Sequence, residues 1–185
     1  MIDEFKTTEA LLEGHFQLTS GLHSTVYLQC ARVLQHPEKA SEFGRSIAEK
    51  FASKGITLVA SPAIGGIVIG HEVARALGAR FIWTEREDGK MTLRRGFTVT
   101  PGEKTLVVED VITTGGSTRE TVECLQAAGA EVLGAASIID RSAGDADVGV
   151  PRVALATLKV LSVKAEECDA CKLGEPVVKP GSRKK

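Results

Sequence analysis

The segment TLVVEDVITTGGST, residues 105–118, decides how the rest of the chain can fold. Residues 105–109 are apolar or β-branched enough to form a buried parallel strand. Two adjacent carboxylates, Glu109 and Asp110, stand where that strand is expected to end. Small residues that carry hydroxyls or no side chain follow, Thr113-Thr114-Gly115-Gly116-Ser117-Thr118. An amphipathic pattern comes next, so the segment predicts a strand, a tight turn and the start of a helix.

This combination suits a sugar phosphate as ligand. Free backbone N–H groups at a helix start, with hydroxyls beside them, bind phosphate, and glycines let the backbone approach its oxygens. Carboxylates repel phosphate, so Glu109 and Asp110 are expected to contact the vicinal hydroxyls of a ribose, with a magnesium ion nearby. The alternative is an ordinary strand–turn–helix connection with polar surface residues. The coincidence of an acid pair with a hydroxyl–glycine turn disfavours it.

VVEDVITTGGST, residues 107–118, resembles the phosphoribosyl-pyrophosphate (PRPP) motif of type I phosphoribosyltransferases. It lacks the Gly-Lys-Ser/Thr of a Walker loop and the G-x-G-x-x-G of a dinucleotide site. The resemblance implies that Mg²⁺ accompanies PRPP, bound mainly through the pyrophosphate, so no separate protein metal site is predicted. The PRPP-binding residues that it implies are Glu109, Asp110, Val111, Ile112, Thr113, Thr114, Gly115, Gly116 and Ser117.

Composition narrows the class of protein. A chain of 185 residues with 43% hydrophobic and 25% charged residues can form one globular domain with a sizeable core. Its net charge of −1 provides no field that favours nucleic acid or an anionic membrane. No apolar run approaches the ~20 residues of a membrane span. The acidic, amphipathic start is unlike a secretory signal, so the cytoplasm is expected.

Four cysteines, Cys30, Cys124, Cys168 and Cys171, are expected to stay reduced in the cytoplasm. Cys168 and Cys171 form a single C-x-x-C pair. A closed zinc site usually needs a second pair or added histidines, so plain thiols near a surface tail are favoured. A metal site shared across subunits, or completed by Cys30, is the alternative.

Strand and helix patterns alternate along the chain, which predicts a parallel α/β sheet. Ser117 with Glu120 has the spacing of a capping box for the helix after the central turn. The segment 86–96 is charged and weakly periodic, which favours an exposed, mobile loop or ribbon. The expected elements are a helix over 3–13, a hairpin-like β unit over 14–34, helices over 37–55, 67–77 and 117–130, and strands over 56–60, 79–85, 105–109, 131–141 and 152–163.

Ligands of parallel sheets bind beyond the carboxyl ends of the strands. The turns 61–66, 85–96 and 109–117 fall at such ends, and Arg141 follows a further strand. These four segments are therefore expected to meet at one rim of the sheet.

Further segments narrow the resemblance to the orotate phosphoribosyltransferases, over nearly the whole chain. They are, in order, GHFQLTSGLHSTVYLQ, SPAIGGIVIG, the WTEREDGK loop, VVEDVITTGGST and IIDRSAG. The resemblance implies a parallel-sheet type I phosphoribosyltransferase fold with a small N-terminal hood. One domain, 1–185, would comprise a hood of about 1–35 with a tail of about 164–185, and a core of about 36–163.

The implied reaction transfers the 5-phosphoribosyl group from PRPP to orotate, giving orotidine 5′-monophosphate and pyrophosphate in pyrimidine biosynthesis. By resemblance, Thr113 and Arg141 contact orotate. The loop 85–96 would reach the neighbouring active site in a homodimer. Its cationic pair, Arg86 and Lys90, would act in catalysis together with Asp110.

The chain departs from the resemblance at several positions. Many members carry a lysine in the hood turn and another in the pyrophosphate turn, where this chain has Thr19 and Gly65. His23 or Tyr27 could replace the hood lysine, although single residues of this kind are more often structural. In the loop, Met91 stands where a histidine is often found.

Two other functions remain open from the sequence. A phosphoribosyltransferase for a purine or for uracil would share the PRPP motif and differ in its hood. A PRPP-sensing regulator would keep the fold without turnover. Such a regulator normally needs a nucleic-acid-binding module, for which this chain offers no spare segment or strong basic patch.

Overall fold

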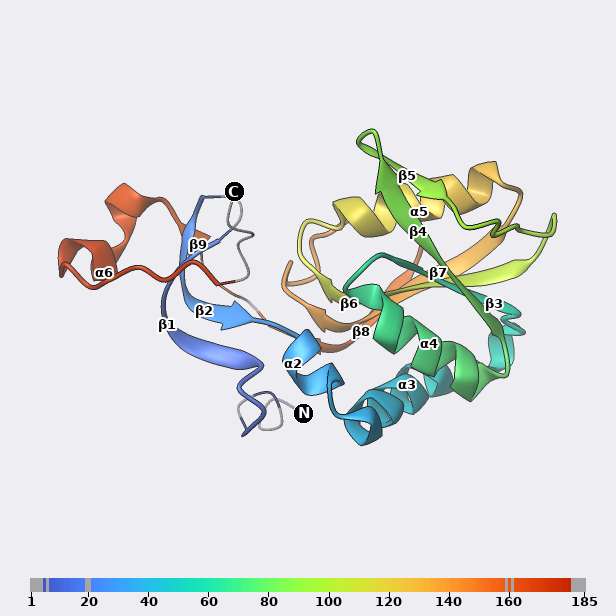
Figure 1. Cartoon of the computed structure of the whole chain (residues 1–185), viewed down its shortest axis with the longest axis horizontal. Helices are drawn as coiled ribbons and strands as arrows, with labels where there is room; N and C mark the ends of the chain where they lie inside the picture. The colour runs from blue at the N-terminus through green and yellow to red at the C-terminus, as the bar shows by residue number, and fades with distance from the viewer. Residues whose placement is uncertain (1–4, 6, 19–20, 159, 161, 181–185) are drawn as a thin grey trace. The chain divides into compact units, whose positions relative to one another are not determined.

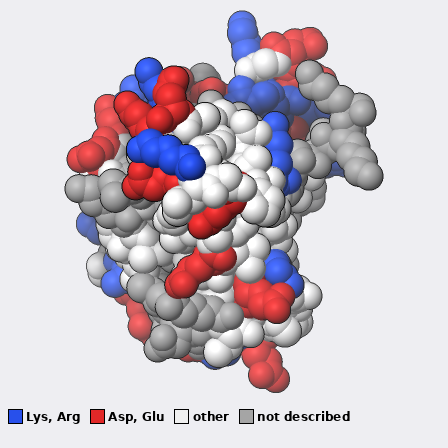
Figure 2. All heavy atoms as spheres, turned by 90° about the vertical axis from the view of Figure 1, so that its left-hand side faces the viewer, with Lys and Arg blue, Asp and Glu red and all other residues white. Residues whose placement is uncertain are grey.

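A computed structural model describes residues 5, 7–18, 21–158, 160 and 162–180. The chain forms two compact units. The core unit is Leu34–Leu158, and the terminal unit combines Met1–Val33 with Lys159–Lys185. Among the described helices, none has the length and apolar character needed to cross a membrane. Acidic and basic side chains are interspersed on the face that Figure 2 shows, in line with the net charge of −1.

A six-stranded sheet lies at the centre of the core unit (Figure 1). Five neighbouring strands are parallel, and the edge strand β5 pairs antiparallel with β4. The predicted α/β class with a parallel sheet is confirmed. In spatial order the strands are β5 (Lys90–Leu93), β4 (Arg80–Glu87), β3 (Leu58–Pro62), β6 (Lys104–Ile112), β7 (Glu131–Asp140) and β8 (Arg152–Thr157).

Helices cover both faces of this sheet (Figure 1). On one face lie α3 (Pro37–Phe51), which continues into the 3-10 helix η1 (Ala52–Lys54), and α4 (Gly66–Leu77). The helix α5 (Gly116–Ala127) lies on the other face, and a short helix, α2 (Ala31–Leu34), precedes α3. Burial on both faces is the reason why the central strands are apolar without alternation.

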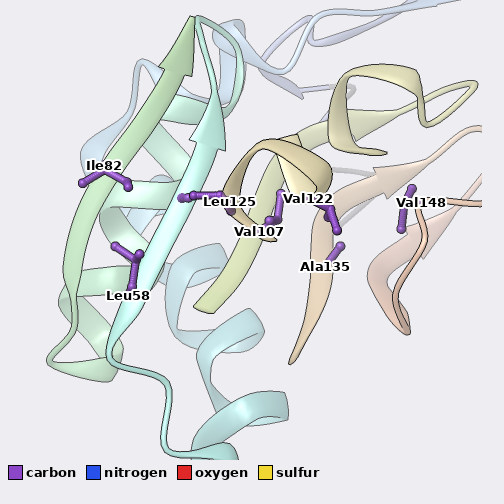
Figure 3. Packing of buried hydrophobic residues seen from close by; sticks show 8 residues of the cluster. Leu58, Ile82, Val107, Val122, Leu125, Ala135 and Val148 are labelled. Atoms are coloured by element: carbon purple, nitrogen blue, oxygen red, sulfur yellow. The ribbon is translucent and has the colours of Figure 1, made fainter. Parts of the chain in front are cut away.

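The core beneath α5 is built from alternate residues of the strands, because successive strand side chains point to opposite faces. Leu58 and Val107 lie on the side of α5, where Leu125 packs against them (Figure 3). The full cluster is Leu58, Ala60, Ile82, Val107, Val122, Leu125, Ala135 and Val148.

The terminal unit contains a small antiparallel sheet of order β1-β2-β9. Its strands are β1 (Leu11–Gln17), β2 (His23–Leu28) and β9 (Ser162–Val163), so both ends of the chain contribute. The 3-10 helix η2 (Ala165–Glu167) and the short helix α6 (Asp169–Lys172) follow β9. The chain then returns beside β1, where Val178 and Phe16 form a parallel bridge.

Two predicted elements of this region differ from the structure. The helix expected over 3–13 falls partly outside the described residues, with Phe5 and Thr7 helical, and its predicted end is wrong because β1 begins at Leu11, which pairs with Leu28. The single strand expected over 152–163 is two strands in different sheets. β8 ends at Thr157 in the core unit, and β9 pairs with β2 in the terminal unit.

Around the central segment the boundaries also differ from prediction. The strand expected to end at 109 runs on to Ile112, because β7 pairs with it as far as Asp140. Both acids therefore lie within β6. The segment 86–96 is an ordered hairpin in part, since Glu87 pairs with Lys90 across a tight turn. The strand predicted over 56–60 is β3, which runs from Leu58 to Pro62.

Candidate active site

A cavity of about 150 Å³ lies at the carboxyl end of β6. The turn between β6 and α5 forms most of its wall. Thr113, Thr114 and Ser117 are exposed there, so their hydroxyls face solvent. The lining residues are Glu109, Val111, Ile112, Thr113, Thr114, Gly115, Gly116, Ser117 and Thr118. Apart from Asp110, these include every residue predicted to bind PRPP.

The helix α5 begins at Gly116, directly after this turn. Its N-cap residue is Gly115 at φ +81°, a left-handed conformation that suits glycine, and no side chain caps the helix. The predicted capping box of Ser117 and Glu120 is therefore wrong. Ser117 lies inside the first helical turn, and the backbone N–H groups at the helix start are left for a ligand.

Gly115 is also required by packing. A Cβ at this position would lie 3.0 Å from Val148 Cγ1 and 3.2 Å from Ala146 Cβ. The loop after β7 is thus pressed against the turn of the cavity. A side chain at position 115 would have to push the two segments apart.

The two carboxylates of β6 are close together and shielded from water. Burial and the neighbouring Asp110 raise the pKa of Glu109 to about 9. Thr118 Oγ1 donates to Glu109 Oε2 at 3.4 Å, which acts in the opposite direction. Burial also raises the pKa of Asp110, although the N–H of Val111 donates to its Oδ1 at 2.9 Å. At neutral pH the pair therefore holds a proton.

The turn that follows β3 lies next to these acids. It spans residues 63–65, since β3 includes Ser61 and Pro62 and α4 begins at Gly66. The Ala63–Ile64 peptide bond is cis. A Cβ at Gly65 would lie 2.8 Å from Asp110 Oδ1. The backbone of this turn thus approaches the Asp110 carboxylate more closely than any side chain at 65 would allow.

A third segment, the loop after β7, is organised by the buried Asp140. Ser142 donates to Asp140 Oδ1 through its N–H at 2.7 Å and its hydroxyl at 2.6 Å. Arg152 Nη1 lies 2.7 Å from Asp140 Oδ2. Burial alone would raise the pKa of Asp140, but the bonds from Ser142 and Arg152 outweigh it and lower the pKa.

Arg141 stands at the base of this loop. Its backbone N–H donates to Ile112 O at 2.8 Å, which joins the end of β7 to the end of β6. The residue predicted to contact the base thus starts beside the turn that follows β6. The role of Asp140 in holding the loop through Arg152, which is twelve positions away, was not predicted from the sequence.

The β4–β5 hairpin carries the cations predicted to act in catalysis. Arg86 Nη2 donates to Glu120 Oε2 of α5 at 2.5 Å. Arg94 and Arg95 are paired with hairpin carboxylates, Glu87 and Glu85 respectively. Within the part of the chain that the structure describes, the Lys90 ammonium forms no ion pair. Of the two cations predicted to act in catalysis, Arg86 is therefore paired with Glu120, and Lys90 is available to a ligand.

The cysteine pair of the terminal unit departs from the favoured prediction of surface thiols, because Cys168 is buried. Among the described residues, the cluster of possible metal ligands around the pair does not include Cys30. The side chains beside the pair are His15 and His23. His23 is only 5% exposed, which removes it from the residues free to contact a base.

Residues 29–159 match the phosphoribosyl transferase domain. The orotate phosphoribosyltransferase of Pelotomaculum thermopropionicum is 56% identical over 180 residues, which cover 97% of this chain and 95% of that protein. That of Chlorobium phaeobacteroides is 54% identical over 183 residues, covering 99% and 95%. The crystal structure of orotate phosphoribosyltransferase from Aeropyrum pernix shares 27% identity at a TM-score of 0.68, covering 85% of this chain and 93% of that chain.

Proposed function

The chain belongs to the phosphoribosyltransferase family, and from its full-length similarity to orotate phosphoribosyltransferases we propose that it transfers the 5-phosphoribosyl group of PRPP to orotate. The products are orotidine 5′-monophosphate and pyrophosphate. The observation that carries this assignment is the cavity at the end of β6, where an acid pair and a hydroxyl–glycine turn line one space.

The turn 113–117 holds the 5-phosphate of the substrate. Backbone N–H groups at the start of α5 and three exposed hydroxyls supply donors for its oxygens. The helix dipole favours the negative charge at this point. Anchoring the phosphate fixes the distance from the turn to C1′, so the reacting carbon is positioned for attack.

The acid pair binds the ribose hydroxyls. One proton shared by Glu109 and Asp110 reduces their repulsion of the nearby phosphates, and a hydroxyl of the diol can donate to the ionised oxygen. Negative charge beside the sugar stabilises the positive charge that develops on it as the C1′–O bond breaks. The carboxylate oxygens are also hard donors of the type that Mg²⁺ accepts.

Mg²⁺ that accompanies PRPP would stabilise the charge of the pyrophosphate leaving group. The Ala63 N–H already donates to Thr84 O, so in the turn 63–65 we assign the backbone N–H groups of Ile64 and Gly65 to this ligand, and no side chain at Gly65 obstructs the approach. We therefore propose that pyrophosphate binds alongside this turn and the acid pair. No protein nucleophile takes part, since C1′ bonds directly to the orotate nitrogen as its bond to pyrophosphate oxygen breaks.

The hairpin supplies cations to the leaving group. Lys90 can bind the pyrophosphate without losing an ion pair, whereas Arg86 must first break its ion pair with Glu120. We place this hairpin at the active site of the neighbouring subunit in a homodimer, as in the family. Thr113 and Arg141 contact orotate, whose carboxylate suits a guanidinium. The cytoplasm is the proposed location, where the four free cysteines stay reduced.

A phosphoribosyltransferase for another base is the second candidate. An adenine phosphoribosyltransferase from Thermoanaerobacter pseudethanolicus has a TM-score of 0.69 at 16% identity, so the fold alone does not select the base. The preference for orotate rests on relatives above 50% identity over nearly the full chain.

The deciding experiment is the PRPP- and Mg²⁺-dependent loss of orotate absorbance, with uracil, hypoxanthine and adenine assayed in parallel. Turnover of orotate alone supports the assignment. Pyrophosphate release with another base would keep the PRPP site and change the base. Tight PRPP binding without turnover of any base would point to a regulator.

A further inference from the structure

Four metal-binding side chains converge in the terminal unit, and none of them has a role in the proposed transfer reaction. They are His15 of β1, His23 of β2, Cys168 directly before α6, and Cys171 of α6. One atom from each, His15 Nε2, His23 Nδ1 and the two Sγ atoms, lies within 4.8 Å of the other three. His15, His23 and Cys168 are buried, and Cys171 is half-buried.

The distances between these atoms are those of a tetrahedral site. His15 Nε2 lies 3.5 Å from each sulfur, and His23 Nδ1 lies 3.2 Å from Cys171 Sγ. The two nitrogens are 2.9 Å apart. Zn²⁺ with Zn–S bonds of about 2.3 Å and Zn–N bonds of about 2.05 Å gives edges of about 3.6 Å for N···S and about 3.3 Å for N···N. Small outward movements of the ligands would fit the ion.

Hydrogen bonding alone does not account for the arrangement. His15 Nδ1 lies 3.0 Å from Glu175 O, a carbonyl that only accepts, so Nδ1 carries the proton. Neutral His15 then has a single lone pair, on Nε2. Three possible donors crowd that lone pair, namely His23 Nδ1, Cys168 Sγ and Cys171 Sγ. A cation at the centre would instead use one lone pair from each of the four atoms.

The bond to Glu175 has a second consequence. Metal-binding histidines commonly donate their other N–H to a carbonyl, which fixes the tautomer and the ring orientation. Here that contact is already present, and it presents Nε2 toward the other ligands. The histidine is therefore oriented for a metal by the backbone that follows the cysteine pair.

The local fold brings the four side chains together. In the pairing of β1 with β2, the two residues Gly14 and His15 lie opposite a single residue, Thr25. This extra residue makes a β-bulge, which changes the direction of the His15 side chain. The backbone of His15 accepts from the Val178 N–H at 2.8 Å. The segment after α6 is thus held against β1 next to the histidine.

We propose that His15, His23, Cys168 and Cys171 bind one Zn²⁺ ion as a structural site. Two thiolates and two neutral imidazoles balance the double positive charge, so the complex is neutral and can be buried. Four protein ligands close the coordination sphere, which is typical of structural rather than catalytic zinc. Binding displaces the two thiol protons to solvent.

The ion would join the two ends of the chain. His15 and Cys168 are 153 positions apart, and both belong to the terminal unit. Small units with little core depend on such links. Besides Cys30 and Cys168, the buried hydrophobic residues of this unit within the described ranges are Phe5, Ala10, Phe16, Leu28 and Val33.

The first test is the metal content of the full chain, purified without chelator from zinc-supplemented cells. We expect about one zinc ion per chain, and two cysteines that react with a thiol reagent only after zinc is removed. Protein without zinc under these conditions, or a disulfide between Cys168 and Cys171, would overturn the assignment. Orotate turnover is not part of this readout, so the outcome is independent of the proposed function.

Cys171→Ser provides the variant and Cys124→Ser the matched control, because Cys124 lies in α5 outside the cluster. Mutation of a residue that only hydrogen-bonds a metal ligand lowers metal affinity by about 10- to 100-fold. Loss of a direct ligand is therefore expected to lower the zinc affinity by more than this. Equal zinc affinity in the two variants would contradict the site.

Cobalt substitution covers the case in which Cys171→Ser fails to fold. Intact wild-type chain with Co²⁺ in place of Zn²⁺ should show the visible bands of a tetrahedral ion and a sulfur-to-cobalt charge-transfer band. A six-coordinate spectrum without the charge-transfer band would exclude the Cys₂His₂ site.

Discussion

The Asp110 carboxylate lies directly against Gly65, although the acid belongs to β6 and the glycine to the turn after β3: a Cβ on Gly65 would lie 2.8 Å from Asp110 Oδ1 and 3.1 Å from its Cγ. The acid of β6 thereby fits against the backbone of the turn after β3. Neither residue can change without affecting the other. The absence of a side chain at 65 is thus part of the geometry of the proposed pyrophosphate site.

Gly65→Ala is expected to displace the Asp110 carboxylate. The new methyl group must move either the acid or the turn, and both are proposed to contact PRPP. We expect kcat/KM for PRPP to fall about tenfold or more, equivalent to about 1.4 kcal/mol. Val68→Ala is the control, because Val68 is 46% exposed on the neighbouring helix α4. Equal kinetics of the two variants would show that the close approach has no functional role.

Asp110→Asn removes negative charge while keeping the shape of the side chain. If the acid holds the ribose and stabilises the positive sugar, steady-state assays should show kcat/KM reduced by about 10²- to 10³-fold. Glu131→Gln serves as the control, because this exposed acid begins β7 at the opposite end of the sheet. Unchanged kinetics in Asp110→Asn would remove the acid pair from the mechanism.

The raised pKa of Glu109 predicts how the free energy of unfolding depends on pH. Its ordinary pKa is 4.5, and burial and Asp110 raise it to about 9 in the folded chain. Between these values the unfolded state releases a proton that the folded state keeps, so stability falls as pH rises. The slope from one such group is at most about 1.4 kcal/mol per pH unit. Urea unfolding followed by Trp83 fluorescence from pH 5 to 9 should show a shallower slope in Glu109→Gln.

Glu103 offers a comparison of opposite sign. The hydrogen bond from Arg80 lowers its pKa, against the effect of burial. Its contribution to stability is present above its ordinary pKa and is lost as pH falls through the lowered value. Glu103→Gln should therefore destabilise the chain at neutral pH, whereas Glu109→Gln should stabilise it. The same direction in both variants would refute the raised pKa of Glu109.

The central motif was predictable because its information is local. An apolar run followed by a hydroxyl–glycine turn was enough to predict the strand β6 and the helix α5 that follows it, because both signals lie within a few residues. The end of β6 was not predictable, because pairing with β7 extends the strand past Asp110 to Ile112. The capping box was wrong because α5 already begins at Gly116, and Glu120 pairs with Arg86 of a distant hairpin.

The features that were not predicted from the sequence depend on contacts between residues far apart in the chain. The cysteine pair could be read as C-x-x-C, but its partners His15 and His23 lie at the other end of the chain. Their convergence depends on a bulge in β1 and on the path of the tail. The two histidines were nevertheless a possible signal in the sequence, because two histidines together with two cysteines can form a closed zinc site.

Lys90→Ala should reduce turnover without changing stability. No ion pair of Lys90 exists within the described residues, so its removal costs little in the resting chain. We expect kcat to fall about 10²-fold with an unchanged melting temperature, if the ammonium stabilises the leaving pyrophosphate. Arg94→Ala is the matched control, a cation of the same hairpin that pairs with Glu87. Loss of the same size in both variants would indicate a general charge effect.

Asp140→Asn tests whether the loop after β7 positions Arg141. The carboxylate accepts from Ser142 and from Arg152, so its neutralisation should cost about 3 kcal/mol of unfolding free energy. Below the melting temperature of the variant, KM for orotate should rise more than KM for PRPP, because the PRPP turn keeps its own contacts. Asp145→Asn, an exposed change in the same loop, should leave both KM values unaltered. A rise in both KM values by the same factor would mean that Asp140 supports the whole rim and not the base site.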